Sequence, residues 1–378
     1  MSLTKWAQRS VAVSLGVVAA CAAGARQQPE PAAVPAPQAG LPPATDTPDA
    51  ASAATGAGDA RGAPASTGAS AQVAPSAGSD AAAGACPSEM KLIDGEYCTD
   101  LERKCLKSWY DKSNKKTVCE LFEPKTSCVG QKIKKKYCID TFEWPNVKGE
   151  RPEVMNRFHQ AQVKCAAAGK RMCTESEWTL ACEGPEMKPF PYGFVRDVNK
   201  CHGDVLWDGP DMKKVAQRDP GELARLWKGV RSGQLPCVSD YGVYDLPGNA
   251  DEVVASETTS GDFRGKFDSV NTGGPWYKGV RNQCRPKIYT HDEGFYYYFL
   301  SFRCCADPDG KPSEPRTPKQ VKAGWKLERV EGLAGFTVAQ MKEKLELKRA
   351  GKCTCEAKDI LCKTMCGTLL GPGAKDAR

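Results

Sequence analysis

Nineteen cysteines are the feature that most constrains how this chain of 378 residues can fold. Eighteen of them lie between Cys86 and Cys366, and the other one is Cys21. An even number of cysteines at this density is typical of an exported protein that is stapled by disulfides. Zinc sites are the alternative, but the chain has only three histidines and no repeated C-x-x-C pair. The sequence therefore predicts a disulfide framework in an exported protein.

The N-terminus has the organisation of a secretion signal. Two basic residues precede a short apolar run at 11–20, which is too short to be a permanent membrane-spanning helix. Residues 18–21, Val-Ala-Ala-Cys, resemble a bacterial lipobox, in which the cysteine receives a lipid. We therefore expect a signal peptide at 1–20 and a bacterial lipoprotein held to a membrane of the cell envelope, the outer membrane or a periplasm-facing one, through Cys21. An ordinary secretion signal with an incidental cysteine is the alternative.

The next segment, 21–85, consists almost entirely of Ala, Pro, Gly, Ser and Thr and contains no aromatic residue. Such a composition buries too little apolar surface to offset the cost of ordering, so we expect a disordered tether. A flexible coil of about 64 residues has a root-mean-square reach of roughly 45 Å. The rest divides into a cysteine-rich segment at 86–135, a central domain at 136–308 and a C-terminal helix with a cysteine-rich tail at 309–378.

Two helices in the central domain have clear boundary signals. Apolar residues recur at helical spacing over 158–168, and a glycine follows them. The second helix, over 174–184, begins with a Thr/Glu capping box and ends at Gly-Pro. Cys165 and Cys182 fall on the core-facing sides of these helices. Core-facing cysteines of an exported protein are more often disulfide halves than reactive thiols.

Three further elements are expected from local pattern. Acids in the first turn favour a helix over 219–230, and a capping box favours another over 337–350. The aromatic run at 293–305 indicates a buried strand. Four cysteines at 353–366 are compatible with two disulfides or with a four-thiolate metal site, which would compete with oxidation outside the cytoplasm.

The lysine run QKIKKKYC at 131–138 is the strongest basic cluster. A basic patch favours anionic partners such as polysaccharide or lipid headgroups, but a solvated charged face explains the same run. Neither interleaved aromatic residues nor a nucleic-acid-binding motif accompanies it. We therefore expect no nucleic-acid partner.

Five short motifs occur in order along the chain, namely GKRMCTESEW (169–178), FPYG (190–193), GVYDLPGN (242–249), GG (273–274) and SFRCC (301–305). Together they resemble the signatures of the formylglycine-generating enzyme, or sulfatase-modifying factor, family. The resemblance covers residues 136–308. It implies an α+β fold of the C-type-lectin-like kind found in that family, with little regular secondary structure and, here, many disulfides.

The resemblance also implies a bound calcium ion. Carried over residue by residue, the family's ligands are the side chains of Asp245 and Glu252 and the carbonyl oxygens of Gly248 and Ala250. Ca²⁺ prefers such oxygen ligands, and a tight turn supplies several of them. A surface turn with two solvated acids is the alternative. The family has a second calcium site with an asparagine ligand. This chain has His202 at the corresponding position, and histidine is a poor calcium ligand.

Catalytic members of the family hold copper(I) between two cysteines just after the Gly-Gly pair, and two thiolates suit linear copper(I) coordination. The corresponding segment of this chain, 273–283, contains no cysteine, so we do not expect copper. The resemblance implies instead that Cys284 is structural and pairs with Cys182, and that Cys165 pairs with Cys304. Each pair closes a loop of about 100 residues or more, which in isolation stabilises a fold by roughly 4 to 5 kcal/mol.

These features favour a non-catalytic, membrane-tethered module that binds a ligand or a partner protein in the cell envelope. The expected ligand surface surrounds the loop 275–283, with Trp276, Tyr277, Arg281 and His291 as candidates; plain packing is the alternative for each. A second hypothesis is an oxidase of the formylglycine-generating type that acts on a protein cysteine. The three histidines are too few and too scattered to predict an iron site. A third hypothesis, an accessory subunit of a surface complex, is not separable from the first by sequence.

Overall fold

The computed structural model describes residues 85–112, 115–259, 263–371 and 373–376. The expected signal peptide, Cys21 and the tether up to residue 84 lie outside the described residues. All described residues belong to one compact unit, Pro75–Arg378. None of the helices in this described part is long and apolar enough to cross a membrane.

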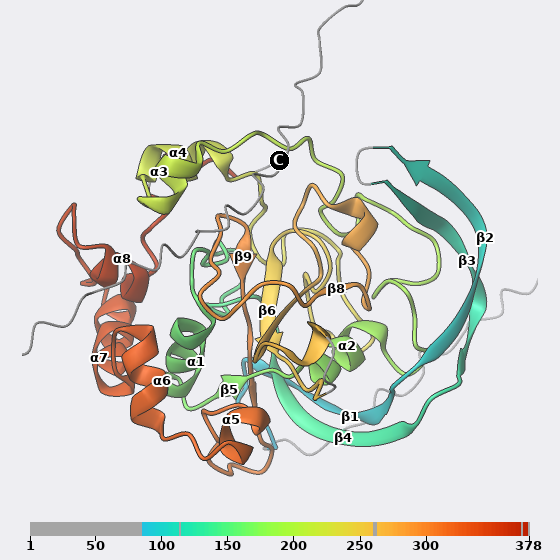
Figure 1. Ribbon diagram of the computed structural model, residues 1–378, viewed down its shortest axis with the longest axis horizontal. Helices are drawn as coiled ribbons and strands as arrows, with labels where there is room; N and C mark the ends of the chain where they lie inside the picture. The colour runs from blue at the N-terminus through green and yellow to red at the C-terminus, as the bar shows by residue number, and fades with distance from the viewer. Residues whose placement is uncertain (1–84, 113–114, 260–262, 372, 377–378) are drawn as a thin grey trace, which may run out of the picture. The chain divides into compact units, whose positions relative to one another are not determined.

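Three sheets organise the described residues (Figure 1). The first has the order β1 (Met90–Cys98), β4 (Lys132–Asp140), β10 (Cys304–Ala306) and β5 (Arg171–Met172). The second pairs β2 (Leu101–Asp111) with β3 (Lys116–Cys128). The third has the order β8 (Lys287–Ile288), β7 (Ser269–Thr272), β6 (Asp251–Ala255) and β9 (Leu300–Ser301). Neighbouring strands are antiparallel except β6 and β9, which are parallel.

The cysteine-rich segment at 86–135 is mainly β-structure. Its strand β1 pairs along its whole length with β4, which crosses the expected boundary between residues 135 and 136. The segment and the central domain therefore share one sheet. Three disulfides fasten this region, namely Cys86–Cys138, Cys98–Cys128 and Cys105–Cys119.

The two helices of the central domain begin where their boundary signals lie. They are α1 (Phe158–Ala167) and α2 (Glu175–Glu183). The Thr174 side chain accepts a hydrogen bond from the Glu177 backbone, and the Glu177 carboxylate accepts one from the Thr174 backbone, so the capping box is formed. The other short helices of this domain are α3 (Met212–Ala216), α4 (Pro220–Leu226) and the 3₁₀ turns η1 (Phe263–Gly265) and η2 (Gly279–Arg281).

Two expectations of local structure were wrong. The helix expected over 219–230 stops at Leu226, because the backbone N–H of Val230 donates to the side chain of Asn249 instead of continuing the helix. The aromatic run 293–305 is not one strand. Its backbone oxygens at Tyr297 and Phe302 accept hydrogen bonds from the loop between β4 and α1, so only short strands form at 300–301 and 304–306.

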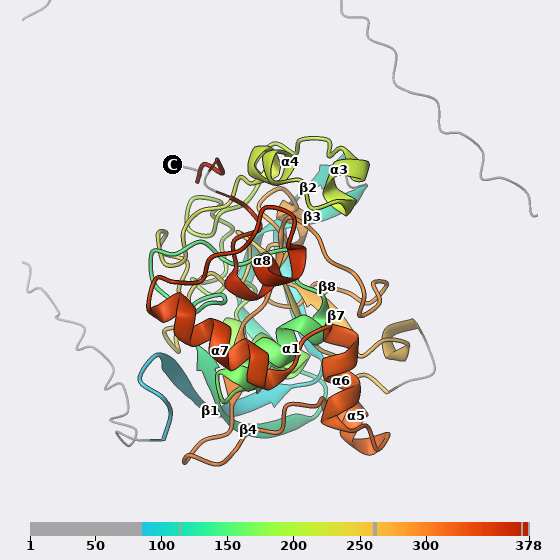
Figure 2. The same cartoon turned by 90° about the vertical axis from the view of Figure 1, so that its left-hand side faces the viewer.

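The C-terminal residues form four helices that gather beside α1 (Figure 2). They are α5 (Pro318–Lys322), α6 (Leu327–Ala334), α7 (Val338–Arg349) and α8 (Ile360–Cys366). The helix α7 starts at the capping box that its sequence predicts. Val163 of α1 packs with Val330 of α6 and Met341 of α7 in one apolar cluster. The tail is therefore attached to the domain through a core of its own.

Nine disulfides join all eighteen cysteines between Cys86 and Cys366. The expected fold class is confirmed, since the described chain is a mixed α+β fold with little regular secondary structure and many disulfides. This number of disulfides indicates an exported protein. The C-terminal cysteines pair as Cys353–Cys366 and Cys355–Cys362.

Candidate functional site

The turn expected to bind calcium is buried and rigid. Asp245 and Asn249 have φ angles of 56° and 51°, and Gly248 has 80°. A Cβ atom at Gly248 would lie 2.6 Å from the backbone oxygen of His202, so the turn requires glycine there. Asn249 fastens the turn, because its backbone donates to His202 and its side chain accepts from the backbone of Val230. His202 thus contributes its backbone to this turn.

Three buried carboxylates surround the turn and share one arginine. Glu143, Asp245 and Glu252 are at most 2% exposed, and Arg303 is completely buried. The guanidinium of Arg303 donates to both oxygens of Glu252, at 2.6 and 2.7 Å, and Trp178 Nε1 donates to the same carboxylate at 3.0 Å. The ion pair therefore occupies both oxygens of Glu252.

Burial, together with the crowding of these acids, raises their pKa values. Burial raises the pKa of Asp245 to about 7, and the nearby charge of Glu252 adds to the effect. Burial and the charge of Asp245 raise the pKa of Glu143 well above its ordinary value. Arg303 acts in the opposite direction on both groups. One guanidinium thus faces three carboxyl groups. The charges of these groups would therefore stabilise a further cation in the cluster.

These residues fit a calcium ion in part. The surplus of buried carboxylates over cations favours a bound cation, and Asp245, Gly248 and Ala250 are all buried at the turn. The fourth expected ligand, Glu252, is held by Arg303 and would have to share its carboxylate. A calcium ion here would supply positive charge to the acid cluster and tie the two ends of the turn together.

Thiolates offer no alternative metal site in the described part of the chain. The one group of three or more His, Cys, Asp or Glu side chains whose ligand atoms lie within 4.8 Å of one another is Cys355, Cys362 and Cys366. All three are bonded in disulfides, as is Cys353. The disulfide interpretation of the C-terminal cysteines therefore replaces the four-thiolate one.

The four residues expected to line a ligand surface do not share one. Trp276 is only 1% exposed and packs edge-on against Trp227, so its assignment to a surface is corrected to the core. Tyr277 is half-buried against Phe299. Trp276 is buried because it packs in the larger apolar core, together with Trp227, Tyr298 and Phe299.

Arg281 is committed to an ion pair. Its guanidinium donates to both oxygens of Asp251, at 2.8 and 3.1 Å, and Asp251 is 1% exposed. The backbone N–H of Gly274 also donates to this carboxylate. Asp251 therefore holds the loop after the Gly-Gly pair onto β6.

His291 lies in an open groove that the sequence did not predict. The aromatic groove has a volume of about 400 Å³ and is lined by Met212, Val215, Ala216, Thr290, His291, Asp292, Gly294, Phe295, Tyr296 and Tyr297. The imidazole of His291 stacks on Phe295 with 3.8 Å between ring centroids, and the Arg218 guanidinium lies 4.6 Å from the ring centroid of Tyr296. The sequence signal for this groove was the aromatic run at 295–299. We interpreted that run as part of a buried strand, which assigned its rings to the core.

Lys287 on β8 supports a test of pH dependence. Its ammonium donates to the Thr179 hydroxyl at 2.8 Å, and burial lowers its pKa from 10.5 to about 8. Between pH 8 and 10.5 the unfolded chain binds more protons at this site, so stability should rise with pH in that window. After allowance for partial exposure, we expect about 1 to 2 kcal/mol.

The matched variant is Lys287→Met, which keeps the length of the side chain without the charge. The free energy of unfolding is measured in urea at pH 7, 8, 9 and 10. The value for the native chain minus the value for this variant should increase as pH rises. A difference that stays constant with pH would show that the ammonium is solvated.

The family follows from comparison with known proteins. Residues 110–308 match the sulfatase-modifying factor enzyme 1-like domain, which is more than half of the chain. The chain belongs to this family of formylglycine-generating-enzyme-like domains.

Two curated relatives from Bos taurus are similar over shorter stretches. One is the inactive C-alpha-formylglycine-generating enzyme 2, which is 34% identical over 117 residues, 30% of this chain and 36% of that protein. The other is a formylglycine-generating enzyme, 24% identical over 180 residues, 45% of this chain and 46% of that protein. The chain thus spans less than half the length of each of these relatives.

Solved structures are similar at low sequence identity. PvdO from Pseudomonas aeruginosa is 16% identical with a TM-score of 0.32, over 57% of this chain and 94% of that one. Variable protein 1 of Treponema denticola is 15% identical with a TM-score of 0.36, over 58% and 95%.

Proposed function

We propose that this protein is a non-catalytic member of its family that works as an exported binding module in the cell envelope, tethered through a lipid on Cys21. One observation carries the proposal. All cysteines from Cys86 to Cys366 are paired in disulfides. Cys284, the next cysteine along the chain after the Gly-Gly pair, is buried and bonded to Cys182. The described chain therefore offers no pair of thiolates to hold copper(I). The similarity to a relative named as inactive supports the same proposal.

The test is a direct assay for the alternative, oxidation of a protein cysteine to formylglycine. The oxidised protein is incubated with copper(I), oxygen and a cysteine-containing peptide, and the peptide is followed by mass spectrometry beside a catalytic family member. We expect no conversion by this protein and no labelling of Cys284 by a thiol reagent. Conversion of the peptide would establish the oxidase instead, and a labelled Cys284 would show a free thiol and so contradict the observation that carries the proposal.

The aromatic groove is the surface that we assign to ligand binding. It is open, it presents the stacked rings of His291 and Phe295, and Arg218 adds a cation beside Tyr296. Aromatic rings and arginine together are common in recognition surfaces, since both give large contact areas with directional interactions. The groove therefore replaces the loop 275–283 as the proposed ligand site.

Calcium is proposed as the structural ion of the turn at 245–252. If it binds there, millimolar calcium should raise the melting temperature, because a ligand at about 100 times its Kd stabilises the folded state by about 2.7 kcal/mol. Asp245→Ala should abolish this calcium-dependent rise. Asp94→Asn, which alters an exposed aspartate on β1, should leave it unchanged.

The readout is the calcium-induced shift in each protein, so a lower baseline stability of Asp245→Ala does not affect it. A native chain that melts at the same temperature in calcium and in chelator would contradict the calcium proposal while leaving the binding module intact.

A further inference from the structure

The ribbon formed by β2 and β3 extends from the rest of the fold with its outer strand uncovered. Two described backbone hydrogen bonds join β3 to the domain. The N–H of Phe122 donates to the oxygen of Phe194, and the N–H of Arg196 donates to the oxygen of Glu120. The strand β2 is paired with β3 alone. Every residue of β2 from Lys104 to Tyr110 is exposed, so side chains on both faces of this strand meet solvent. Figure 1 shows the ribbon arching along one side of the domain.

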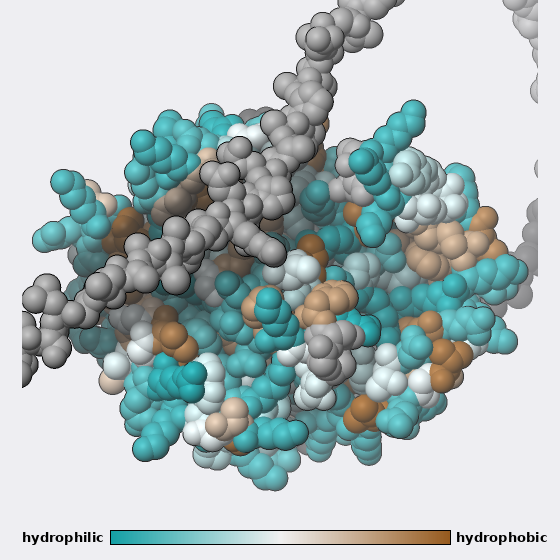
Figure 3. All heavy atoms as spheres, in the orientation of Figure 1, coloured by the Kyte–Doolittle hydropathy of each residue, from teal (hydrophilic) through white to brown (hydrophobic). Residues whose placement is uncertain are grey.

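This exposed stretch carries three large apolar side chains. Leu106 is 50% exposed, Trp109 is 42% exposed and Tyr110 is 57% exposed. They lie within five consecutive residues of β2. Trp109 and Tyr110 are consecutive and paired without a bulge between them, so their side chains point to opposite faces of the ribbon and flank the uncovered strand on both sides. In Figure 3 the side of the molecule where the ribbon lies shows apolar side chains among hydrophilic ones.

The same stretch is strongly basic. Its exposed lysines are Lys104, Lys107, Lys112, Lys115 and Lys116, and the single acid between residues 104 and 117 is Asp111. One of the lysines, Lys107, forms an exposed ion pair with Glu120 across the ribbon at 3.0 Å. Exposed aromatic rings surrounded by lysines therefore define the chemistry of this surface.

That chemistry fits the surface of a membrane with anionic lipids. Trp and Tyr rings prefer the interface between headgroups and acyl chains, and lysines bury their stems while their ammonium groups reach the phosphates. Each lysine near an anionic surface contributes attraction that salt screens. Strand addition by a protein partner is disfavoured, because lysines along an edge strand oppose pairing with another strand.

We propose that the β2–β3 ribbon docks edge-on, through β2, on membranes that contain anionic lipids, with Leu106, Trp109 and Tyr110 entering the interface on the two sides of this strand and the lysines contacting headgroups. The inference does not require the lipid on Cys21. If that lipid is present, the ribbon supplies a second attachment, which matters because one acyl chain alone gives marginal and reversible membrane binding.

The experiment uses the full chain carrying Cys21→Ser, so that no lipid contributes. Flotation measures its affinity for vesicles of phosphatidylcholine alone and for vesicles with phosphatidylglycerol in a ratio of about 7 to 3. We expect at least about tenfold tighter binding to the anionic vesicles, weakened by salt. Replacement of Lys104, Lys112 and Lys116 by glutamine should lower this affinity about tenfold to a hundredfold.

The decisive variant is Trp109→Ser with Tyr110→Ser, which leaves the charge unchanged. It should lose about tenfold in affinity for the anionic vesicles, because the interfacial anchors are gone. The matched control is Leu206→Ser with Leu333→Ser, which removes side chains that are 80% and 47% exposed elsewhere. This control should bind as the native chain does, and circular dichroism checks that all variants are folded.

Two outcomes would overturn the proposal. One is the absence of any preference of the native chain for anionic vesicles. The other is undiminished binding by the Trp109→Ser, Tyr110→Ser variant together with equally tight binding of the native chain to soluble dextran sulfate. In that case the lysines would form a general polyanion site. Both outcomes are independent of the formylglycine assay, so they leave the proposed function standing.

Discussion

Replacing Arg303 with methionine is expected to destabilise the folded protein by about 3 to 5 kcal/mol. Arg303 is completely buried, and its guanidinium donates to both oxygens of Glu252 and to the backbone oxygens of Tyr244 and Asp140. Methionine has a similar length but no donor, so it leaves a buried carboxylate without compensation. The loss should appear as a lower midpoint of urea unfolding at neutral pH, with an unchanged slope.

Two further variants separate this effect from a general effect of charge. Lys132→Met removes one partner of an ion pair with Glu96 whose side chains are both 59% exposed, and it should cost less than about 1 kcal/mol. Adding Glu252→Gln to Arg303→Met should recover part of the loss, because the uncompensated charge is then gone. An effect of Arg303→Met no larger than that of Lys132→Met would mean that water reaches the acid cluster.

The second large effect concerns two neighbouring disulfides, and we expect the loss of both to exceed the sum of the two single losses by about 1 kcal/mol. Cys165–Cys304 and Cys173–Cys305 join nearly the same two stretches of chain. With one bond present, the other closes an effective loop of only about nine residues, so removing either alone should cost about 2.5 kcal/mol. Removing both should cost about 6 kcal/mol, because the long loop is then held only by Cys182–Cys284.

The variants replace each pair of cysteines with alanine, and urea unfolding is followed under non-reducing conditions. Peptide mapping confirms that the other pairs are intact. We expect Cys165–Cys304 to contribute less than the roughly 4 to 5 kcal/mol of an isolated loop, because Cys173–Cys305 already joins nearly the same two stretches. Single variants that each lose as much as the double variant would show instead that the two bonds form one cooperative unit.

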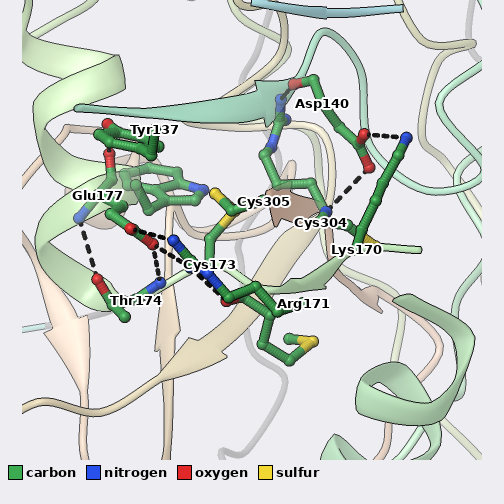
Figure 4. Close-up of a disulfide and its surroundings, with 12 residues drawn as sticks. Tyr137, Asp140, Lys170, Arg171, Cys173, Thr174, Glu177, Cys304 and Cys305 are labelled. Carbon is green, nitrogen blue, oxygen red and sulfur yellow. Dashed lines mark hydrogen bonds and ion pairs between the residues drawn. A yellow bond between two sulfur atoms is a disulfide. The ribbon is translucent and has the colours of Figure 1, made fainter. Parts of the chain in front are cut away.

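Strand geometry explains why the two disulfides coexist. Cys304 and Cys305 are consecutive in β10, so their side chains point to opposite faces of the sheet. Cys304 lies with Cys165 in one apolar cluster, and Cys305 lies with Cys173 in the other. Figure 4 shows Cys173 bonded to Cys305, with the backbone N–H of Cys304 donating to Asp140 beside them. The pair of adjacent cysteines therefore connects two separate cores.

Several features of this protein were predictable from local sequence. The start of α2 follows from the capping box at Thr174, and the start of α7 from a second one, because each depends on residues within one turn of helix. The pairs Cys165–Cys304 and Cys182–Cys284, which the family resemblance implied, are present in the structure. Such features depend on short stretches or on motifs that keep their order along the chain.

Packing between distant segments decided which aromatic rings are buried and where a groove forms. Whether Trp276 lies in a core or on a surface depends on Trp227 and Tyr298, which are far from it in sequence. The groove at His291 is lined by residues of the segment 293–297, whose backbone oxygens at Glu293 and Tyr297 accept hydrogen bonds from Phe158 and Met155 instead of forming a strand. The sequence by itself determined where α2 and α7 begin, that the cysteines form a disulfide framework, and the resemblance to the family. Only the tertiary structure decided which rings are buried, which acids share Arg303 and which strand stays uncovered, because burial depends on the partners that distant segments bring.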